Sequence, residues 1–179
     1  MLGRGQFQDQ VEGHRPWEDN EIETYRRHYA IGTEQRLAFE LLLNTGQRVS
    51  DVVKMGRKHV KDGAITITQK KSGETVEVTI PILPALNVVL DEVQARRITP
   101  TFLLNQSGQA RTADGLSTMF AEWRKQAGLP DDLHAHGLRK AFCRVAAEAG
   151  MTPHEIMSLS GHKTLGEVMR YTAAVDRKK

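Results

Sequence analysis

Hydrophobic residues recur at helical spacing along most of this 179-residue chain. Between Thr33 and Gly46, for instance, leucines and an alanine form one apolar stripe that follows a helix-capping residue and precedes a helix-ending glycine. Two later segments open on capping-box sequences, at residues 152–155 and 164–167. The pattern predicts helices that begin near Trp17, Glu34, Val49, Pro84, Ala113, Leu138, Pro153 and Leu165. The helix that begins near Val49 is expected to be short and to end at Met55, before Gly56.

One stretch of the chain alternates with period two instead. Ile65 and Ile67 alternate with threonines, and residues 75–80 alternate in the same way beyond a loop at 71–74. The two runs predict a β-hairpin. Lys71 falls in phase with the two isoleucines, on the face expected to point inward. The expected fold class is therefore mainly α with a small antiparallel β-sheet (α+β).

Composition narrows the class of protein. Apolar residues make up 39% and charged residues 26%, the mix of a soluble globular domain. No run approaches the roughly 18 apolar residues of a membrane span, and residues 1–10 lack the apolar core of a signal peptide. Cys143 is the single cysteine, which excludes a disulfide framework and a Cys-based zinc site and indicates a small buried residue. A cytoplasmic protein with no membrane partner is expected.

Charge is distributed unevenly along the chain. Lys and Arg outnumber Asp and Glu by 25 to 22, a net charge of +3. Residues 1–132 hold 17 basic and 18 acidic side chains, a net of −1, whereas residues 133–179 hold eight and four, a net of +4. An anionic partner is therefore expected at the final quarter of the chain.

Six residues carry side chains suited to phosphate chemistry, and two of them lie in the first half of the chain. Arg48 follows a helix end and precedes Asp51 by three residues. It can bind phosphate with Asp51 in support, or it can form a surface pair with Asp51 across one helical turn. Lys71 at the hairpin tip can be catalytic or can serve solubility alone.

The other four candidates fall in the basic final quarter. His136 and Arg139 are one helical turn apart and share a face, although His134 competes with His136 for that role. An arginine among apolar neighbours is rarely left without a partner. His162 follows a helix-ending glycine, and Tyr171 comes nine residues later. Either of these two can instead be structural.

Together, these side chains suit the chemistry of a phosphodiester. Two arginines can neutralise its non-bridging oxygens, and a tyrosine hydroxyl is a competent nucleophile. A lysine can protonate the leaving oxygen, and histidines can hydrogen-bond phosphate or carry a proton. The sequence shows no acidic cluster for a divalent metal, no Walker-type loop and no G-x-G-x-x-G. The set predicts phosphoryl transfer with no metal and no cofactor.

Four motifs, in this order and at this spacing, resemble the catalytic domain of the tyrosine recombinases, the phage integrase family. Each motif is weak alone, but four in register are specific, and the resemblance covers about residues 16–175. The motifs are Thr45-Gly-Gln-Arg48-Val-Ser-Asp51, Lys71-Ser-Gly, His136-Gly-Leu-Arg139, and Ser160-Gly-His162 with Arg170-Tyr171.

The resemblance implies a site-specific DNA recombinase, a strand-transferase that cleaves and rejoins DNA through a 3′-phosphotyrosyl intermediate without metal or ATP. The implied partners are double-stranded DNA and further recombinase protomers, in a tetrameric synapse for the full-length protein. The resemblance implies that Arg48, Arg139 and His162 contact the scissile phosphate. Tyr171 would be the nucleophile, and Lys71 would protonate the 5′-oxygen. His136 would act in acid–base chemistry or orient the phosphate, and Asp51 would support the site.

The resemblance also implies how the chain is organised. Residues 16–179 correspond to the catalytic domain, and residues 1–15 to a flexible leader or linker remnant. The chain is expected to lack the N-terminal core-binding domain that family members usually carry. We therefore expect a monomeric domain with little recombination activity by itself, acting in the cytoplasm on bacterial or phage DNA at the nucleoid. Lys140 stands where the family often has another histidine.

Three alternatives remain open from the sequence. A type IB topoisomerase-like enzyme would share the chemistry and relax supercoils without a specific site. Residues 137–159 also read as helix, short turn and helix, which fits a non-catalytic helix-turn-helix module. A small helical interaction protein would show no salt-dependent DNA binding.

Overall fold

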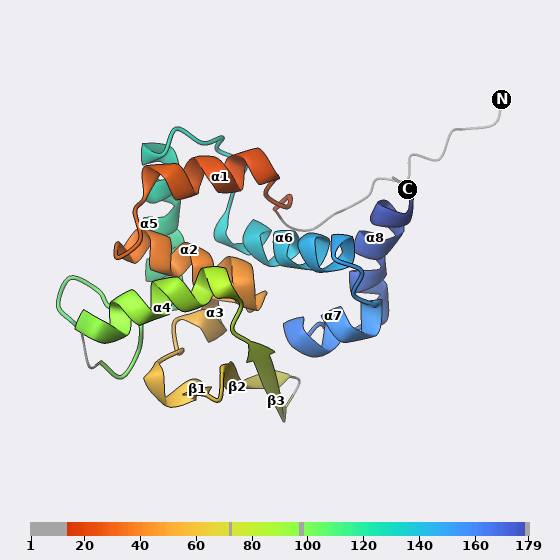
Figure 1. The fold of residues 1–179 in the computed structure, drawn as a ribbon, viewed down its shortest axis with the longest axis horizontal. Helices are drawn as coiled ribbons and strands as arrows, with labels where there is room; N and C mark the ends of the chain where they lie inside the picture. The colour runs from red at the N-terminus through yellow and green to blue at the C-terminus, as the bar shows by residue number, and fades with distance from the viewer. Residues whose placement is uncertain (1–13, 72, 97–98, 178–179) are drawn as a thin grey trace.

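The computed structural model describes residues 14–71, 73–96 and 99–177, and it confirms a mainly helical chain with one small sheet (Figure 1). The expected leader therefore lies outside the described residues, except for its last two residues. The described elements are α1 Asp19–His28, α2 Glu34–Thr45, α3 Val49–Val52, the 3₁₀ helix η1 Arg57–His59, β1 Val60–Lys61, β2 Ala64–Lys71, β3 Glu74–Pro81, α4 Pro84–Arg96, α5 Ala113–Gln126, α6 Ala135–Glu148, α7 Pro153–Ser160 and α8 Leu165–Asp176.

Five helix ends among the described elements follow the capping residues that the sequence predicts. The side chains of Thr33, Thr112 and Thr152 each accept a hydrogen bond from the backbone N–H three residues later. Gly46 and Gly161 end α2 and α7 in the left-handed conformation, with φ of 63° and 71°. Gly46 lies two residues before Arg48, and Gly161 directly precedes His162, so these helix ends position two residues of the candidate site.

Two local predictions were wrong. The capping box at 164–167 does not form, because the backbone of Thr164 is more extended (φ −126°) than that of Thr152 (φ −71°) and its side chain makes no capping bond. The helix predicted over 49–55 ends at Val52. The N–H groups of Lys54 and Met55 donate to the carbonyls of the third residue back, and at this turn Met55 enters the core and Gly56 packs on a backbone carbonyl.

The sheet is an antiparallel meander in the order β1-β2-β3. The hairpin register pairs Ile65 with Ile80 and Lys71 with Glu74, as the alternation predicts. The two-residue strand β1 is too short to show in the sequence pattern. Ile65, Ile67 and Gln69 form the buried face of β2.

Helix α2 runs through the centre of the fold, with α4, α3 and α6 packed around it (Figure 1). Its Phe39 stacks on Tyr25 of α1, with ring centroids 4.4 Å apart, and Phe120 of α5 stacks on the other side of the same tyrosine. A second, smaller cluster joins α6, α7 and α8 and includes Cys143. Burial raises the pKa of Cys143 to about 11, so its thiol stays protonated. None of the described helices is long and apolar enough to cross a membrane.

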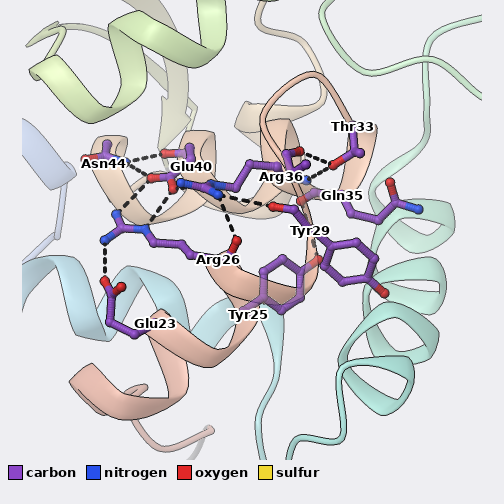
Figure 2. Close-up of polar contacts among 10 residues, drawn as sticks. Glu23, Tyr25, Arg26, Tyr29, Thr33, Gln35, Arg36, Glu40 and Asn44 are labelled. Atoms are coloured by element: carbon purple, nitrogen blue, oxygen red, sulfur yellow. Dashed lines mark hydrogen bonds and ion pairs between the residues drawn. The ribbon is translucent and has the colours of Figure 1, made fainter.

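A buried ionic network joins α1 to α2 (Figure 2). The Glu40 side chain is fully buried and accepts hydrogen bonds from Arg26 Nε at 2.9 Å, Arg36 Nε at 2.8 Å and Asn44 Nδ2 at 2.7 Å. Arg36 also donates to the backbone carbonyls of Arg26 and Tyr29. Every oxygen of the buried carboxylate therefore has a partner, which offsets the cost of removing its charge from water.

We expect Glu40→Ala to lower the free energy of unfolding by about 3 kcal/mol, because it leaves two partly buried guanidinium groups without their carboxylate. Urea unfolding checks this. Glu23→Ala is the matched control, since Glu23 pairs with the same Arg26 at the surface and should change stability by less than about 1 kcal/mol. Equal losses in the two variants would contradict a special role for the buried carboxylate.

Candidate active site

A pocket of about 530 Å³ opens between the start of α6, the turn after α7 and the face of α8. It brings together five of the six candidate residues, which lie up to 123 positions apart between Arg48 and Tyr171. Its lining consists of Pro16, Arg48, His136, Arg139, Lys140, His162, Lys163, Glu167, Arg170 and Tyr171.

Arg139 forms the floor of this pocket and is only 3% exposed. Its Nη1 donates to the backbone carbonyls of Gly46 and Ser160, each at 2.7 Å. These two bonds fix the guanidinium between the ends of α2 and α7 and leave its remaining donors without a partner in the described structure. Burial and, secondarily, the charge of Arg48 lower the pKa of Arg139. Such a cation is stabilised by an incoming anion.

Arg48 stands at the start of α3 beside Arg139, and within the described residues its guanidinium makes no hydrogen bond or ion pair. The surface pair with Asp51 does not form. Asp51 is instead 8% exposed, with an Oδ2 atom that has no hydrogen-bond partner in the part of the chain described. Burial raises the pKa of this carboxyl, while Arg48 opposes the shift. Arg48 thus remains available to a ligand.

His136 lies in the first turn of α6, where helix N–H groups attract anions. The residue as a whole is exposed at the mouth of the pocket, but the protein around its ring excludes part of the solvent, and Arg139 and Lys140 add positive charge. Together these effects lower the pKa of His136 to about 4. The imidazole is therefore neutral near pH 7, and in the free protein it is a weak base. The alternative His134 occupies the N-cap position of α6 without a side-chain capping bond, and its ring lies tilted against that of His14, outside the pocket lining.

An NMR titration of the free protein should show a His136 ring midpoint well below 6.5, with the signal assigned through His136→Gln. Between pH 4 and 6.5 the unfolded chain binds a proton that the folded chain does not, so the native protein should gain stability relative to His136→Gln as pH rises through this window. A midpoint at or above 6.5 would contradict the electrostatic account of the pocket.

His162 is held by the residue that ends α7. Its Nδ1 lies 2.6 Å from the Oγ of Ser160, and that hydroxyl also lies 2.7 Å from the backbone carbonyl of Ile156. Because Ser160 is fully buried, its hydroxyl fixes the ring orientation and leaves the Nε2 edge turned from this bond. Since the serine hydroxyl donates its one proton to Ile156, it accepts from Nδ1 of His162, and only the protonated ring also carries a donor on Nε2 that suits an anion.

Tyr171 lies on α8, with its ring against the second apolar cluster and its side chain lining the pocket. Burial is the main cause that raises the pKa of Tyr171, and Arg139 and Arg170 oppose the shift. The hydroxyl is therefore protonated in the free protein at neutral pH, and its use as a nucleophile requires loss of a proton during the reaction.

Lys71 ends β2, and its side chain lies outside the described structure. Four further charged residues line the pocket although the sequence assigned them no role: Lys140, Lys163, Glu167 and Arg170. The sequence signal for two of them is their helical spacing, since Glu167 is four residues before Tyr171 and Lys140 is four residues after His136. Within the residues described, no group of three or more His, Cys, Asp or Glu side chains is arranged to hold a metal ion.

Sequence comparison identifies the family of this site. A profile of the phage integrase family matches residues 19–178. The chain is 29% identical over 149 residues to tyrosine recombinase XerC of Rhodospirillum centenum, a match that covers 79% of this chain and 43% of that protein. A putative prophage phiRv2 integrase of Mycobacterium tuberculosis is 33% identical over 119 residues, covering 64% of this chain and 32% of the relative.

Solved structures agree with the sequence match. A lambda integrase dimer bound to a COC′ core site superimposes with a TM-score of 0.71 at 26% identity, covering 89% of this chain and 47% of that one. The Tn1549 transposon integrase in complex with transposon right end DNA gives 0.76 at 19% identity, covering 96% and 66%, which supports the fold alone.

The chain belongs to the phage integrase family, and it has the fold of the tyrosine recombinase catalytic domain. The family resemblance and the fold class expected from the sequence are thereby confirmed. The chain spans about half the length of the curated Xer relatives it matches, 43% to 51%.

Proposed function

We propose that this chain is the catalytic domain of a site-specific DNA recombinase that cleaves and rejoins strands through a 3′-phosphotyrosyl bond. The observation that carries the proposal is the convergence of two arginines, two histidines and a tyrosine on one pocket, from segments distant in the sequence. The two guanidinium groups suit the non-bridging oxygens of a phosphodiester, whose charge grows in the transition state. Membership of the phage integrase family supports the same chemistry.

In the cleavage step, the Tyr171 oxygen attacks the phosphorus atom and the bond from phosphorus to the 5′-oxygen breaks. The negative charge of the bound phosphate raises the basicity of His136, which then receives the tyrosine proton, and Lys71 supplies a proton to the departing 5′-oxygen. The product is a 3′-phosphotyrosyl bond and a free 5′-hydroxyl. Attack by a 5′-hydroxyl of a partner strand reverses the step, so rejoining requires no ATP.

The proposed partners are double-stranded DNA and further copies of the recombinase. Two solved structures of lambda integrase support this, one of a dimer bound to a core site and the other of a tetramer bound to a Holliday junction. The basic final quarter of this chain supplies matching charge. Bacterial and prophage relatives support action in the cytoplasm, at the nucleoid. Residues 16–179 would be the catalytic unit.

Covalent capture tests the proposal. The chain is incubated with a random-sequence library of short nicked duplexes, and protein–DNA adducts that survive detergent are recovered and sequenced. Recovery of adducts with a shared sequence is expected. Adducts without sequence preference, together with relaxation of supercoiled plasmid, would favour a topoisomerase-like enzyme instead, and complete absence of adducts would refute the proposal.

A further inference from the structure

Two buried glutamines join the segments that carry the site residues, although neither lines the pocket. Gln47 directly precedes Arg48 and is fully buried. Gln69 lies two residues before Lys71 on β2 and is 1% exposed. Buried amides are costly unless they are hydrogen-bonded, so the partners of these two side chains show what they do.

The Gln47 amide connects three parts of the chain. Its Nε2 donates to the backbone carbonyl of Leu159 at 2.7 Å and to that of Thr45 at 2.9 Å. Its Oε1 accepts a hydrogen bond from Gln69 Nε2. The turn before Arg48, the end of α7 and strand β2 are thereby linked through one buried pair of side chains.

The far side of the Gln69 amide contacts the turn that leads to His162. A Cβ atom built on Gly161 would overlap the Gln69 Oε1, so the hairpin packs against this turn without space for a side chain. The same Oε1 has no hydrogen-bond partner in the described structure. This close approach fixes the distance between β2 and the segment that carries His162.

An apolar residue would fill the same place at lower cost. Gln69 is the third inward residue of β2, after Ile65 and Ile67, and continues their buried face. Leucine there would pack without any amide to satisfy. A hydrogen-bonded amide pair is directional, which apolar packing is not, so it holds β2 in one orientation relative to the segment that carries Gln47.

We propose that Gln47 and Gln69 are positioning residues that hold the end of β2, and with it Lys71, in register with Arg48 and His162. This inference rests on the proposed function, in which Lys71 protonates the departing 5′-oxygen. Loss of the amide pair should therefore weaken the step that needs this proton and should leave phosphate binding intact.

A modified substrate tests this role. A duplex with the cleavable sequence found by covalent capture is prepared with oxygen or with sulfur at the bridging 5′ position. Sulfur leaves as a thiolate and needs no proton. We expect Gln69→Leu to slow cleavage of the oxygen substrate by about 10- to 100-fold, to bind the duplex as the native chain does, and to cleave the sulfur substrate within a few-fold of the native rate. Lys71→Ala should show the same pattern.

The double variant Gln47→Leu, Gln69→Leu separates positioning from stability. Removing both side chains also takes the donor from the carbonyls of Thr45 and Leu159, so the free energy of unfolding should fall further than in Gln69→Leu. Cleavage of the oxygen substrate should be no slower than in Gln69→Leu, because the amide pair is already lost there. Thr68→Val, on the exposed face of the same strand, should change neither quantity.

If the native chain forms adducts, any of three results would overturn the inference. These are native cleavage by Gln69→Leu, an equal loss on the oxygen and sulfur substrates, or a further loss of cleavage in the double variant that follows its further loss of stability. Failure of the native chain to form any adduct would instead remove the proposed function and the inference with it.

Discussion

Tyr171→Phe is expected to abolish the covalent DNA adduct and to leave the fold and DNA binding unchanged. The substitution removes only the hydroxyl, which makes no hydrogen bond within the described structure, and it retains the ring that packs on the second apolar cluster. Phenylalanine offers no nucleophile, so the loss should be complete at any reaction time. Denaturing gels measure the adduct, and fluorescence anisotropy of a labelled duplex measures binding.

Tyr29→Phe is the matched control for that experiment. The Tyr29 hydroxyl donates to the Trp123 carbonyl at 2.8 Å and lies outside the pocket lining. Its removal should lower the free energy of unfolding by about 1 kcal/mol and leave the adduct unchanged. If Tyr171→Phe still forms adducts at the native rate, a different residue is the nucleophile.

The second large effect is expected at Arg139. Arg139→Lys keeps a positive charge but loses the branched guanidinium group. In the native side chain, Nη1 donates to two backbone carbonyls and the other nitrogens can donate to phosphate. Cleavage should fall by about 10²- to 10³-fold, the usual cost of losing one donor aimed at a transition-state oxygen. Stability should fall by about 2 kcal/mol, because the carbonyls of Gly46 and Ser160 lose their donor.

Arg124→Lys controls for the stability loss. Arg124 is similarly buried, at 7% exposure, and donates to the carbonyl of Pro130 and to Asp131, with no part in the pocket. This variant should lose stability and retain cleavage. A loss of cleavage in Arg139→Lys that is no greater than in Arg124→Lys would show that Arg139 acts through the fold alone.

Much of the secondary structure could be predicted because its causes are local. Caps such as Thr33 and Thr152, the glycine at 46 and the alternation in β2 act within a few residues. The early end of α3 could not be predicted, since it depends on where Met55 finds a place in the core. The failed cap at Thr164 likewise reflects a backbone angle that the sequence of the segment does not encode by itself.

The candidate site divides in the same way. Motif spacing selected Arg48, His136, Arg139, His162 and Tyr171, and the fold places all five around one pocket. The sequence did not reveal the buried position of Asp51 or the carbonyl partners of Arg139, because both depend on contacts between distant segments. The alternation in β2 predicts that the Gln69 side chain points inward. Its hydrogen-bond partner Gln47 lies 22 residues away in the sequence, so only the structure identifies the pair.

Identification of the bond between protein and DNA tests the central claim most directly. The adduct from covalent capture is digested with a protease and a nuclease, and mass spectrometry locates the residue and the DNA end that are joined. The account predicts a nucleotide attached through its 3′-phosphate to Tyr171, with a 5′-hydroxyl on the released strand. Attachment to any other residue, or through a 5′-phosphate, would contradict it.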